Sequence, residues 1–237
     1  MTTGAGKIIW KGAEIPALLP GLEFFEDGHV YKVNGAVWKS VTQYTKLISN
    51  HDFVTEIDAD YAKTTSKLDK EYNAKKAQLD ALVHLNFGSV VHDYLYKDDM
   101  DILDFNSPEF DHRFDGYIAG WNAECVKRGW DRKKMLAEYP LYSKKYLYAG
   151  RLDNLFETEK YDWLIDKKTG QPSPTTGPQL AGYGQAAIEW GLTTLGRLRL
   201  LEVCIDKNGV VKTQPFDFKS CLQDFLMAYS LTNKYKK

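Results

Sequence analysis

The stretch AGRLDNLFETEKYDWLIDKKTG, residues 149–170, holds two apolar runs separated by a short polar turn. This pattern predicts consecutive strands over 149–158 and 161–166 that form a hairpin. Pairing of the two strands would bring Asp153 close to Asp166. Converging carboxylates suit Mg²⁺, a hard cation that prefers oxygen ligands. The stretch therefore predicts a sheet that carries a cation site, although an aspartate such as Asp153 also commonly stabilises a turn.

An aspartate two residues before a lysine occurs three times, at Asp131, Asp166 and Asp217, so this spacing alone carries little weight. Only Asp166 ends an apolar strand, Trp163-Leu164-Ile165. Residues two apart share one face of a strand, so Asp166 and Lys168 are expected to point to the same side. There they would offer a carboxylate to a metal and an ammonium group to a water or phosphate. A surface ion pair at a strand end is the alternative interpretation.

Two residues outside the hairpin extend the candidate site. Glu138 lies at the start of a strand predicted over 137–148 and offers a third carboxylate. His92 follows Gly88 by four residues on a predicted helix, so both lie on one helix face. A glycine at this spacing predicts close packing against the sheet, which would direct the imidazole inward. The alternative is a histidine of the hydrophobic core.

A third contribution is predicted from the helix that Pro178 opens and that runs to about residue 190. Gln179 and Tyr183 lie one turn apart on this helix. The free N–H groups and positive dipole at a helix start suit an anion. An ordinary amphipathic helix would have the same pattern.

The remaining elements complete an α/β pattern. Short hairpin strands are expected over 22–39, a helix capped by Ser40 through Ile48, helical segments over 56–83, from 88 and over 110–128, a loop over 97–109, strands over 198–205 and from Val210, and a C-terminal helix. Helices followed by three strands, a helix and two further strands predict a mixed sheet flanked by helices.

Composition limits the class of protein. The 237 residues are 43% hydrophobic and 14% aromatic, as in a packed soluble fold. No run approaches the roughly 20 apolar residues that span a bilayer, and the N-terminus lacks the apolar core of a secretory signal, so a cytoplasmic location and no membrane partner are expected. Cys125, Cys204 and Cys221 are widely spaced, which favours reduced thiols. Three cysteines cannot supply four thiolates to an iron–sulfur cluster within one chain.

Charge is unevenly distributed along a chain of net charge −1. Eight acidic residues against two basic ones lie between 93 and 116, and eight basic residues against two acidic ones lie between 127 and 151. Such segregation can create a basic surface that attracts a phosphate backbone. Charged stretches are also found as ordinary solvated faces.

Five short motifs occur in a fixed order: Gly88-x-x-x-His92, Glu138-x-Pro140, Gly150-Arg-Leu-Asp153, Asp166-Lys-Lys168-Thr-Gly170 and Gln179-x-x-x-Tyr183. In this order they resemble the RecB-like branch of the PD-(D/E)XK nucleases, which includes single-domain phage exonucleases and CRISPR-associated exonucleases. The resemblance covers about residues 88–183. The superfamily's Pro-Asp is Leu152-Asp153 here, and the iron–sulfur subgroup is excluded by the cysteine count.

The resemblance implies a restriction-endonuclease-like core over 61–237 with an N-terminal hairpin and helical extension over 1–60, forming one nuclease domain. Asp153 and Asp166 would bind Mg²⁺, for which Mn²⁺ would substitute.

In this scheme His92 and the Lys167 carbonyl complete the protein ligands, and Glu138 supports the metal site or holds a second ion. Lys168 would activate the attacking water. The residues expected to position DNA are Gln179, Tyr183 and Arg151.

The function that follows is a DNA exonuclease that processes ends in phage recombination or repair, in the cytoplasm of a bacterial host if the chain is phage-encoded. Open alternatives are an endonuclease on the same core, a catalytically inactive DNA-binding or scaffolding member, and an α/β domain with coincidental matches. A single-strand annealing protein is a partner by analogy only.

Oligomeric state, polarity, strand preference and the role of the acidic segment 93–115 stay open. The sequence contains no phosphate-binding loop of the G-x-x-x-x-G-K-[ST] type, so ATP-driven activity is not expected.

Overall fold

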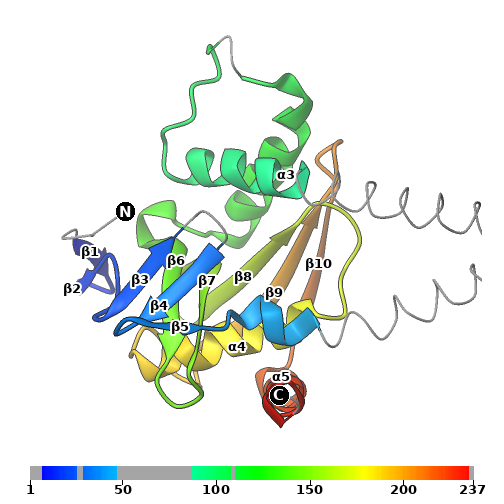
Figure 1. The fold of residues 1–237 in the computed structure, drawn as a ribbon. Helices are drawn as coiled ribbons and strands as arrows, with labels where there is room; N and C mark the ends of the chain where they lie inside the picture. Colours follow the sequence, from blue (N-terminus) through cyan, green and yellow to red (C-terminus); the bar gives the residue numbers. More distant parts are fainter. Residues whose placement is uncertain (1–6, 26–28, 47–86, 108–109, 235–237) are drawn as a thin grey trace, which may run out of the picture.

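A five-stranded mixed sheet forms the centre of the protein, with strand order β10-β9-β8-β7-β6 (Figure 1). The computed structural model describes residues 7–25, 29–46, 87–107 and 110–234. The strands are β6 Met135–Ser143, β7 Tyr148–Glu157, β8 Asp162–Lys168, β9 Leu198–Ile205 and β10 Val211–Phe216. Strands β8 and β9 are parallel and the other neighbours are antiparallel. The predicted α/β fold with a mixed sheet is confirmed.

Helices cover both faces of this sheet (Figure 1). On one face, α4 (Thr176–Glu189) and α5 (Phe218–Lys234) pack over a core that includes Leu164. On the other face, α3 (Asp115–Arg128) and a helix of residues 87–99 pack over a core that includes Ile165. Leu164 and Ile165 are both completely buried. Their apolar side chains on opposite faces explain why β8 is a central strand.

The parallel pairing of β8 with β9 needs a crossover connection, and α4 provides it. Pro178 lies in the first turn of this helix, as expected. The three cysteines are buried free thiols. In the described part of the chain, no helix is both long and apolar enough to cross a bilayer.

The N-terminal region adds two small sheets beside the central sheet, and their buried residues, such as Trp10 and Tyr31, belong to the core under α4. Strands β1 (Lys7–Trp10) and β2 (Ala13–Pro16) form a hairpin, and β3 (Leu22–Phe25), β4 (Val30–Val33) and β5 (Ala36–Trp38) form a three-stranded sheet. Asn34 and Gly35 both have positive φ in the β4–β5 turn, a conformation that Asn-Gly favours, and the short strands expected within 22–39 are present.

Ser40 caps the next helix as predicted. Its Oγ accepts a hydrogen bond from the Gln43 N–H at 3.2 Å, and Gln43 Oε1 accepts one from the Ser40 N–H at 2.9 Å. This reciprocal pair is a capping box, and residues 41–46 are helical. The end of the predicted helix at Ile48 and the helical segment over 56–83 lie outside the described residues.

Three predicted elements have wrong boundaries. Strand β6 starts earlier and ends at Ser143, and a turn over 144–147 separates it from β7, so the prediction of one strand over 137–148 was wrong at both ends. Glu138 consequently lies inside the strand. Strand β8 continues through Lys168 because β9 pairs with it that far. The helix from 87 continues to 99, into the stretch predicted as a loop, because cationic side chains from distant elements neutralise its last aspartates.

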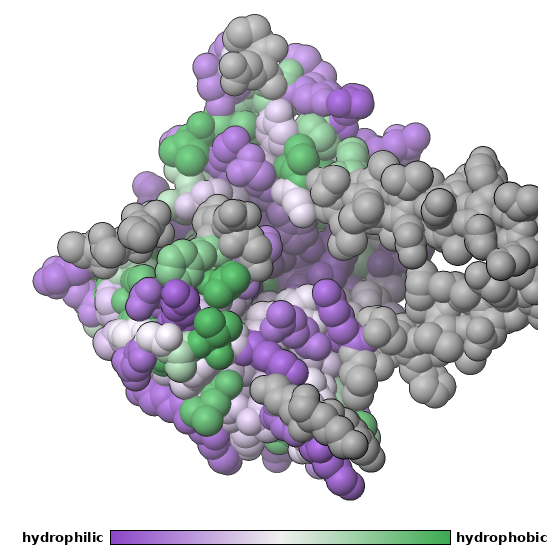
Figure 2. All heavy atoms as spheres, in the orientation of Figure 1, coloured by the Kyte–Doolittle hydropathy of each residue, from purple (hydrophilic) through white to green (hydrophobic). Residues whose placement is uncertain are grey.

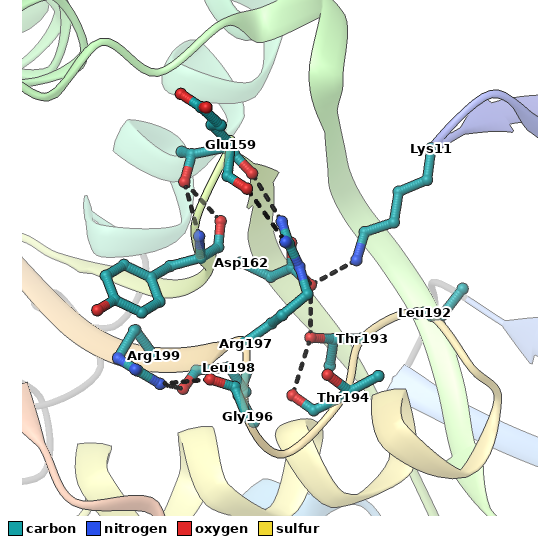
Figure 3. Close-up of polar contacts among 12 residues, drawn as sticks. Lys11, Glu159, Asp162, Leu192, Thr193, Thr194, Gly196, Arg197, Leu198 and Arg199 are labelled. Atoms are coloured by element: carbon teal, nitrogen blue, oxygen red, sulfur yellow. Dashed lines mark hydrogen bonds and ion pairs between the residues drawn. The ribbon is translucent and has the colours of Figure 1, made fainter.

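A buried carboxylate at the start of β8 ties the N-terminal hairpin to the core (Figure 3). Asp162 is completely buried and accepts hydrogen bonds from Thr193 at 2.7 Å, from Arg197 at 3.1 Å and from Lys11. Lys11 follows β1, whereas Thr193 and Arg197 lie between α4 and β9. Burial raises the pKa of Asp162, but the hydrogen bonds from Arg197, Lys11 and Thr193 more than offset it, and the pKa is lowered.

Replacing Asp162 by asparagine is expected to lower the free energy of unfolding by about 3 kcal/mol at pH 7, the scale of a broken buried ion pair. Because the folded-state pKa of Asp162 is depressed, its stabilisation is present above about pH 4 and is lost as pH falls through the folded-state value. The difference between wild type and Asp162→Asn should therefore narrow in acid, measured by urea unfolding at several pH values.

The exposed Asp224→Asn on α5 serves as the matched control and should change stability by less than about 0.5 kcal/mol. A difference between wild type and Asp162→Asn that persists unchanged at pH 3 would contradict this account.

Candidate metal centre

The face shown in Figure 2 is hollowed, with a hydrophilic floor, between the helices that cover one side of the sheet and the N-terminal strands. In the orientation of Figure 1 this hollow lies over strands β7 and β8. These two strands carry Asp153, Asp166 and Lys168.

Three predicted site residues converge from three elements. His92 on the helix of residues 87–99, Glu138 on β6 and Asp153 on β7 each offer one ligand atom, and these atoms lie within 4.8 Å of one another. The His92 Nδ1 lies 3.6 Å from Asp153 Oδ2. Two carboxylates and an imidazole within this distance can bind one divalent cation together.

Glu138 reaches the group because the backbone of β6 is distorted at this residue. Its φ is +47°, in the left-handed region that a non-glycine residue enters at a cost of about 1 to 3 kcal/mol. It lies opposite Asp153, between the register pairs Ala137 with Asn154 and Tyr139 with Leu152. Such strain inside a strand persists only where surrounding contacts hold it, and it occurs mostly at functional sites.

The core residues around this distortion confirm that the regular alternation of β6 breaks here. Leu136 and Tyr139 are three residues apart, yet both belong to the core cluster under α4. The facing residues of β7, Leu155 and Leu152, show the same spacing in the same cluster. Regular strands place residues two or four apart on one face. The break leaves the ligand atoms of Glu138 and Asp153 within 4.8 Å of each other.

Asp166 and Lys168 point to the same side of β8, as strand alternation predicts. The Lys168 Nζ lies 2.6 Å from Asp166 Oδ2, and Asp166 is buried. Burial, together with the charges of Asp153 and Glu202, raises the pKa of Asp166 to about 7, against the opposite effect of Lys168. Asp166 therefore lies within electrostatic reach of Asp153, but it is outside the group of three ligand atoms.

Lys167 was predicted to contribute only its carbonyl. Its backbone N–H donates to Asp153 Oδ2 at 2.8 Å, and its backbone also hydrogen-bonds His92. The Lys167 side chain is completely buried on the opposite face, where its Nζ lies 3.0 Å from Asp99 Oδ2. The direction of the Lys167 side chain could have been predicted from the sequence, because a strand that directs residues 166 and 168 to one face must direct 167 to the other.

Glu202 is a further residue that sequence reasoning missed. It pairs in register with Asp166 on the neighbouring strand β9 and is completely buried. Its Oε1 accepts hydrogen bonds from the Ser173 N–H at 3.0 Å and from the Thr176 hydroxyl at 2.6 Å, at the start of α4. The negative charge expected at this helix start is thus supplied by the protein. A glutamate inside the apolar run of β9 was the available signal.

The predicted DNA-positioning residues lie beside the site. Gln179 donates from Nε2 to the Tyr183 hydroxyl at 3.3 Å on α4. The Tyr183 ring fills the space next to Gly150, where an added Cβ would lie 2.5 Å from a ring carbon. Gly150 therefore makes room for the Tyr183 ring. The Arg151 Nε lies 2.8 Å from Glu138 Oε2, and its guanidinium stacks over Phe24.

The pKa values of Glu138 and His92 are shifted toward the neutral form of each group. Burial and the neighbouring Asp153 raise the pKa of Glu138 to about 7, against the effect of Arg151 and Lys167. Burial lowers the pKa of His92, with Asp153 acting in the opposite direction, so the imidazole is neutral near pH 7. A neutral His92 imidazole and a Glu138 carboxyl that releases its proton near pH 7 can both donate to a divalent cation.

The acidic and basic stretches of the sequence meet in space. Arg132 of the basic stretch lies 2.9 Å from Asp98 and 3.2 Å from Asp99 of the acidic stretch. Glu124 pairs with Lys127 and Arg128. Arg132 is thus paired with the acidic stretch, whereas Lys127 and Arg128 are paired with Glu124, which lies between the two stretches. A basic surface formed by the other cations of the basic stretch stays a prediction.

No protein-family model and no curated protein sequence matches the chain. Among solved structures, the chain is similar to one described as "Crystal structure of SSO0001", with 16% identity and a TM-score of 0.28, covering 60% of this chain and 74% of that chain. A similarity at this level carries no argument about function.

Glu138→Gln is expected to stabilise the metal-free protein at pH 8. Because the folded-state pKa of Glu138, about 7, lies above the ordinary 4.5, ionisation of this carboxyl destabilises the fold as pH rises between these values. In chelator, the variant should melt about 3 to 6 °C higher than wild type at pH 8 and at nearly the same temperature at pH 4.

Glu124→Gln is the matched control with the opposite sign. Burial raises the pKa of Glu124, but Arg128 and Lys127 outweigh this and lower it. Its ionised form therefore stabilises the fold above the ordinary value, and Glu124→Gln should lower the melting temperature at pH 8. Destabilisation by both variants at pH 8 would contradict the assignment of Glu138 as a carboxyl held in an unfavourable site.

Proposed function

We propose that this protein is a Mg²⁺-dependent DNA nuclease of the PD-(D/E)XK kind on a restriction-endonuclease-like core, and that it acts as an exonuclease on DNA ends. The observation that supports this best is the pairing of Asp166 and Lys168 on one strand, close to Asp153, whose ligand atom lies within 4.8 Å of those of His92 and Glu138. A carboxylate set for a cation and an adjacent ammonium group are the parts that phosphodiester hydrolysis requires.

The residues that would hold the cation are His92, Glu138 and Asp153, with Asp166 beside them. A bound divalent cation supplies a nucleophilic water near neutral pH and neutralises charge on the phosphorane. The neutral imidazole of His92 is ready to donate its lone pair without losing a proton. The Lys167 N–H fixes the orientation of the Asp153 carboxylate.

Lys168 is suited to orient the attacking water and to stabilise the developing negative charge. Burial lowers the pKa of its ammonium group, but Asp166 and Asp153 outweigh this effect and raise it, so Lys168 stays charged. A charge already in place needs no reorganisation as the transition state forms. Gln179, Tyr183 and Arg151 would position the DNA strand through its phosphates.

The assignment to DNA ends comes from the resemblance to phage exonucleases, since hydrolysis by these residues does not itself require a free end. An endonuclease on the same core and a DNA-binding protein without cleavage are the alternatives. The presence of all candidate ligands and the lysine together favours an active enzyme. A role in recombination or repair, with an annealing protein as partner, follows from the same resemblance.

Asp166→Ala and Lys168→Ala are each expected to slow DNA cleavage at least about a hundredfold, the scale of losing one electrostatic contact at a reacting centre. Far-UV circular dichroism should be unchanged. Lys219→Ala is the matched control, because Asp217-Phe218-Lys219 repeats the same spacing at the start of α5. Wild-type rates of DNA degradation by both site variants would remove the basis of the proposal.

End-labelled linear duplex and a sealed circle of the same sequence distinguish the two kinds of nuclease. With Mg²⁺, an exonuclease degrades the linear DNA and spares the circle, and EDTA stops the reaction. Cutting of the circle would instead establish an endonuclease. Binding of either DNA without cleavage, at any Mg²⁺ or Mn²⁺ concentration, would favour the inactive DNA-binding protein.

A further inference from the structure

Asp99 lies where a carboxylate is unfavourable, at the C-terminal end of the helix of residues 87–99. It is also buried, at 5% exposure. An unpaired buried charge in this position would be strongly destabilising. Its presence therefore needs compensation from other parts of the chain.

Four side chains from four different places supply that compensation. The Asp99 carboxylate accepts hydrogen bonds from Trp121 Nε1 at 2.6 Å, from Lys167 Nζ at 3.0 Å and from Asn154 Nδ2 at 3.1 Å, and Arg132 Nε lies 3.2 Å away. Two of these partners, Asn154 and Lys167, belong to the strands that carry Asp153 and Asp166.

Lys167 connects this buried group with the candidate metal centre. Its ammonium group binds Asp99 on the helix, while its backbone N–H binds Asp153 and its backbone also hydrogen-bonds His92. His92 and Asp99 lie seven positions apart on the same helix, which is two turns. One residue of β8 thus touches both ends of the helix segment that brings the imidazole to the site.

We propose that Asp99 and Lys167 form a positioning pair, which sets the helix of residues 87–99 against β8 at the height and rotation where His92 meets Glu138 and Asp153. This inference rests on the proposed function, since a divalent cation is what those three residues would bind together. Neither Asp99 nor the Lys167 side chain contacts the cation in this scheme.

The physical reason for an ion pair in this place is its directionality. The helix also contacts the sheet through Val91 and Leu95, which are completely buried in an apolar cluster. Apolar contacts tolerate small sliding and rotation, whereas a hydrogen-bonded buried ion pair permits one arrangement. Groups of this kind behind metal ligands typically contribute 10- to 100-fold in metal affinity.

The Asp99–Lys167 pair gives a structural role to part of the acidic segment over 93–115. Asp98 and Asp99 are neighbours, and Arg132 pairs with both. Only Asp99, however, reaches Lys167 and the strands below it. Asp98 therefore provides a comparison that differs by one position along the same helix end.

The test measures Mn²⁺ binding by isothermal titration at 20 °C, with Asp99→Asn compared with Asp98→Asn. Asp99→Asn should weaken Mn²⁺ binding at least about tenfold, whereas Asp98→Asn should leave it within about threefold of wild type. The double variant Asp99→Asn/Lys167→Met removes both buried charges, which is often close to neutral for stability. It should fold, and it should also bind Mn²⁺ at least about tenfold more weakly.

The outcomes separate this inference from the proposed function. Wild type that binds no Mn²⁺ overturns both. Wild type that binds Mn²⁺, with a folded Asp99→Asn or double variant that binds it equally well, overturns the positioning pair alone. Failure of Asp99→Asn and of the double variant to fold also overturns it, because the pair would then support the whole fold. Equal weakening in Asp98→Asn would show a general effect of charge and count against the pair.

Discussion

The ammonium group of Lys167 lies without access to water between the central sheet and the helix of residues 87–99, 3.0 Å from Asp99. Either charge alone would be costly in this interior, so each requires the other in place. The helix must therefore reach Asp99 before it ends, and β8 must direct residue 167 to this face. Residues 166 and 168 are then directed to the opposite face, where the candidate site is.

The candidate metal centre concentrates features that oppose stability. Glu138 has a strained backbone, and burial raises the pKa values of Glu138 and Asp166 to about 7. These features are retained in a region that two layers of packed helices and a central sheet hold rigid. Strained and electrostatically unfavourable groups supported by a stable scaffold are typical of functional sites, where binding of a cation relieves the unfavourable charge.

The types of the elements could be predicted from the sequence because strand and helix periods are local properties. The strands over 149–158, 161–166 and 198–205 and the helix from Pro178 are all present, with small changes at their ends. The predicted boundaries are wrong where residues far away in the sequence determine the local structure. The helix from 87 extends through Asp99 because Lys167, Arg132 and Trp121 satisfy its last carboxylate. None of these partners is near it in sequence.

Sequence alone determined the common face of Asp166 and Lys168, because side-chain direction in a strand alternates with a period of two. The resemblance of its motifs predicted Asp153, Asp166 and His92 as ligands and Glu138 as a supporting carboxylate. Only the tertiary structure brings the ligand atoms of His92, Glu138 and Asp153 within 4.8 Å of one another and leaves Asp166 outside this group. The distortion at Glu138, the pairing of Glu202 beside Asp166 and the buried Lys167–Asp99 pair were decided by tertiary structure. Each depends on contacts between segments far apart in the chain, and local patterns carry no information about how such segments meet.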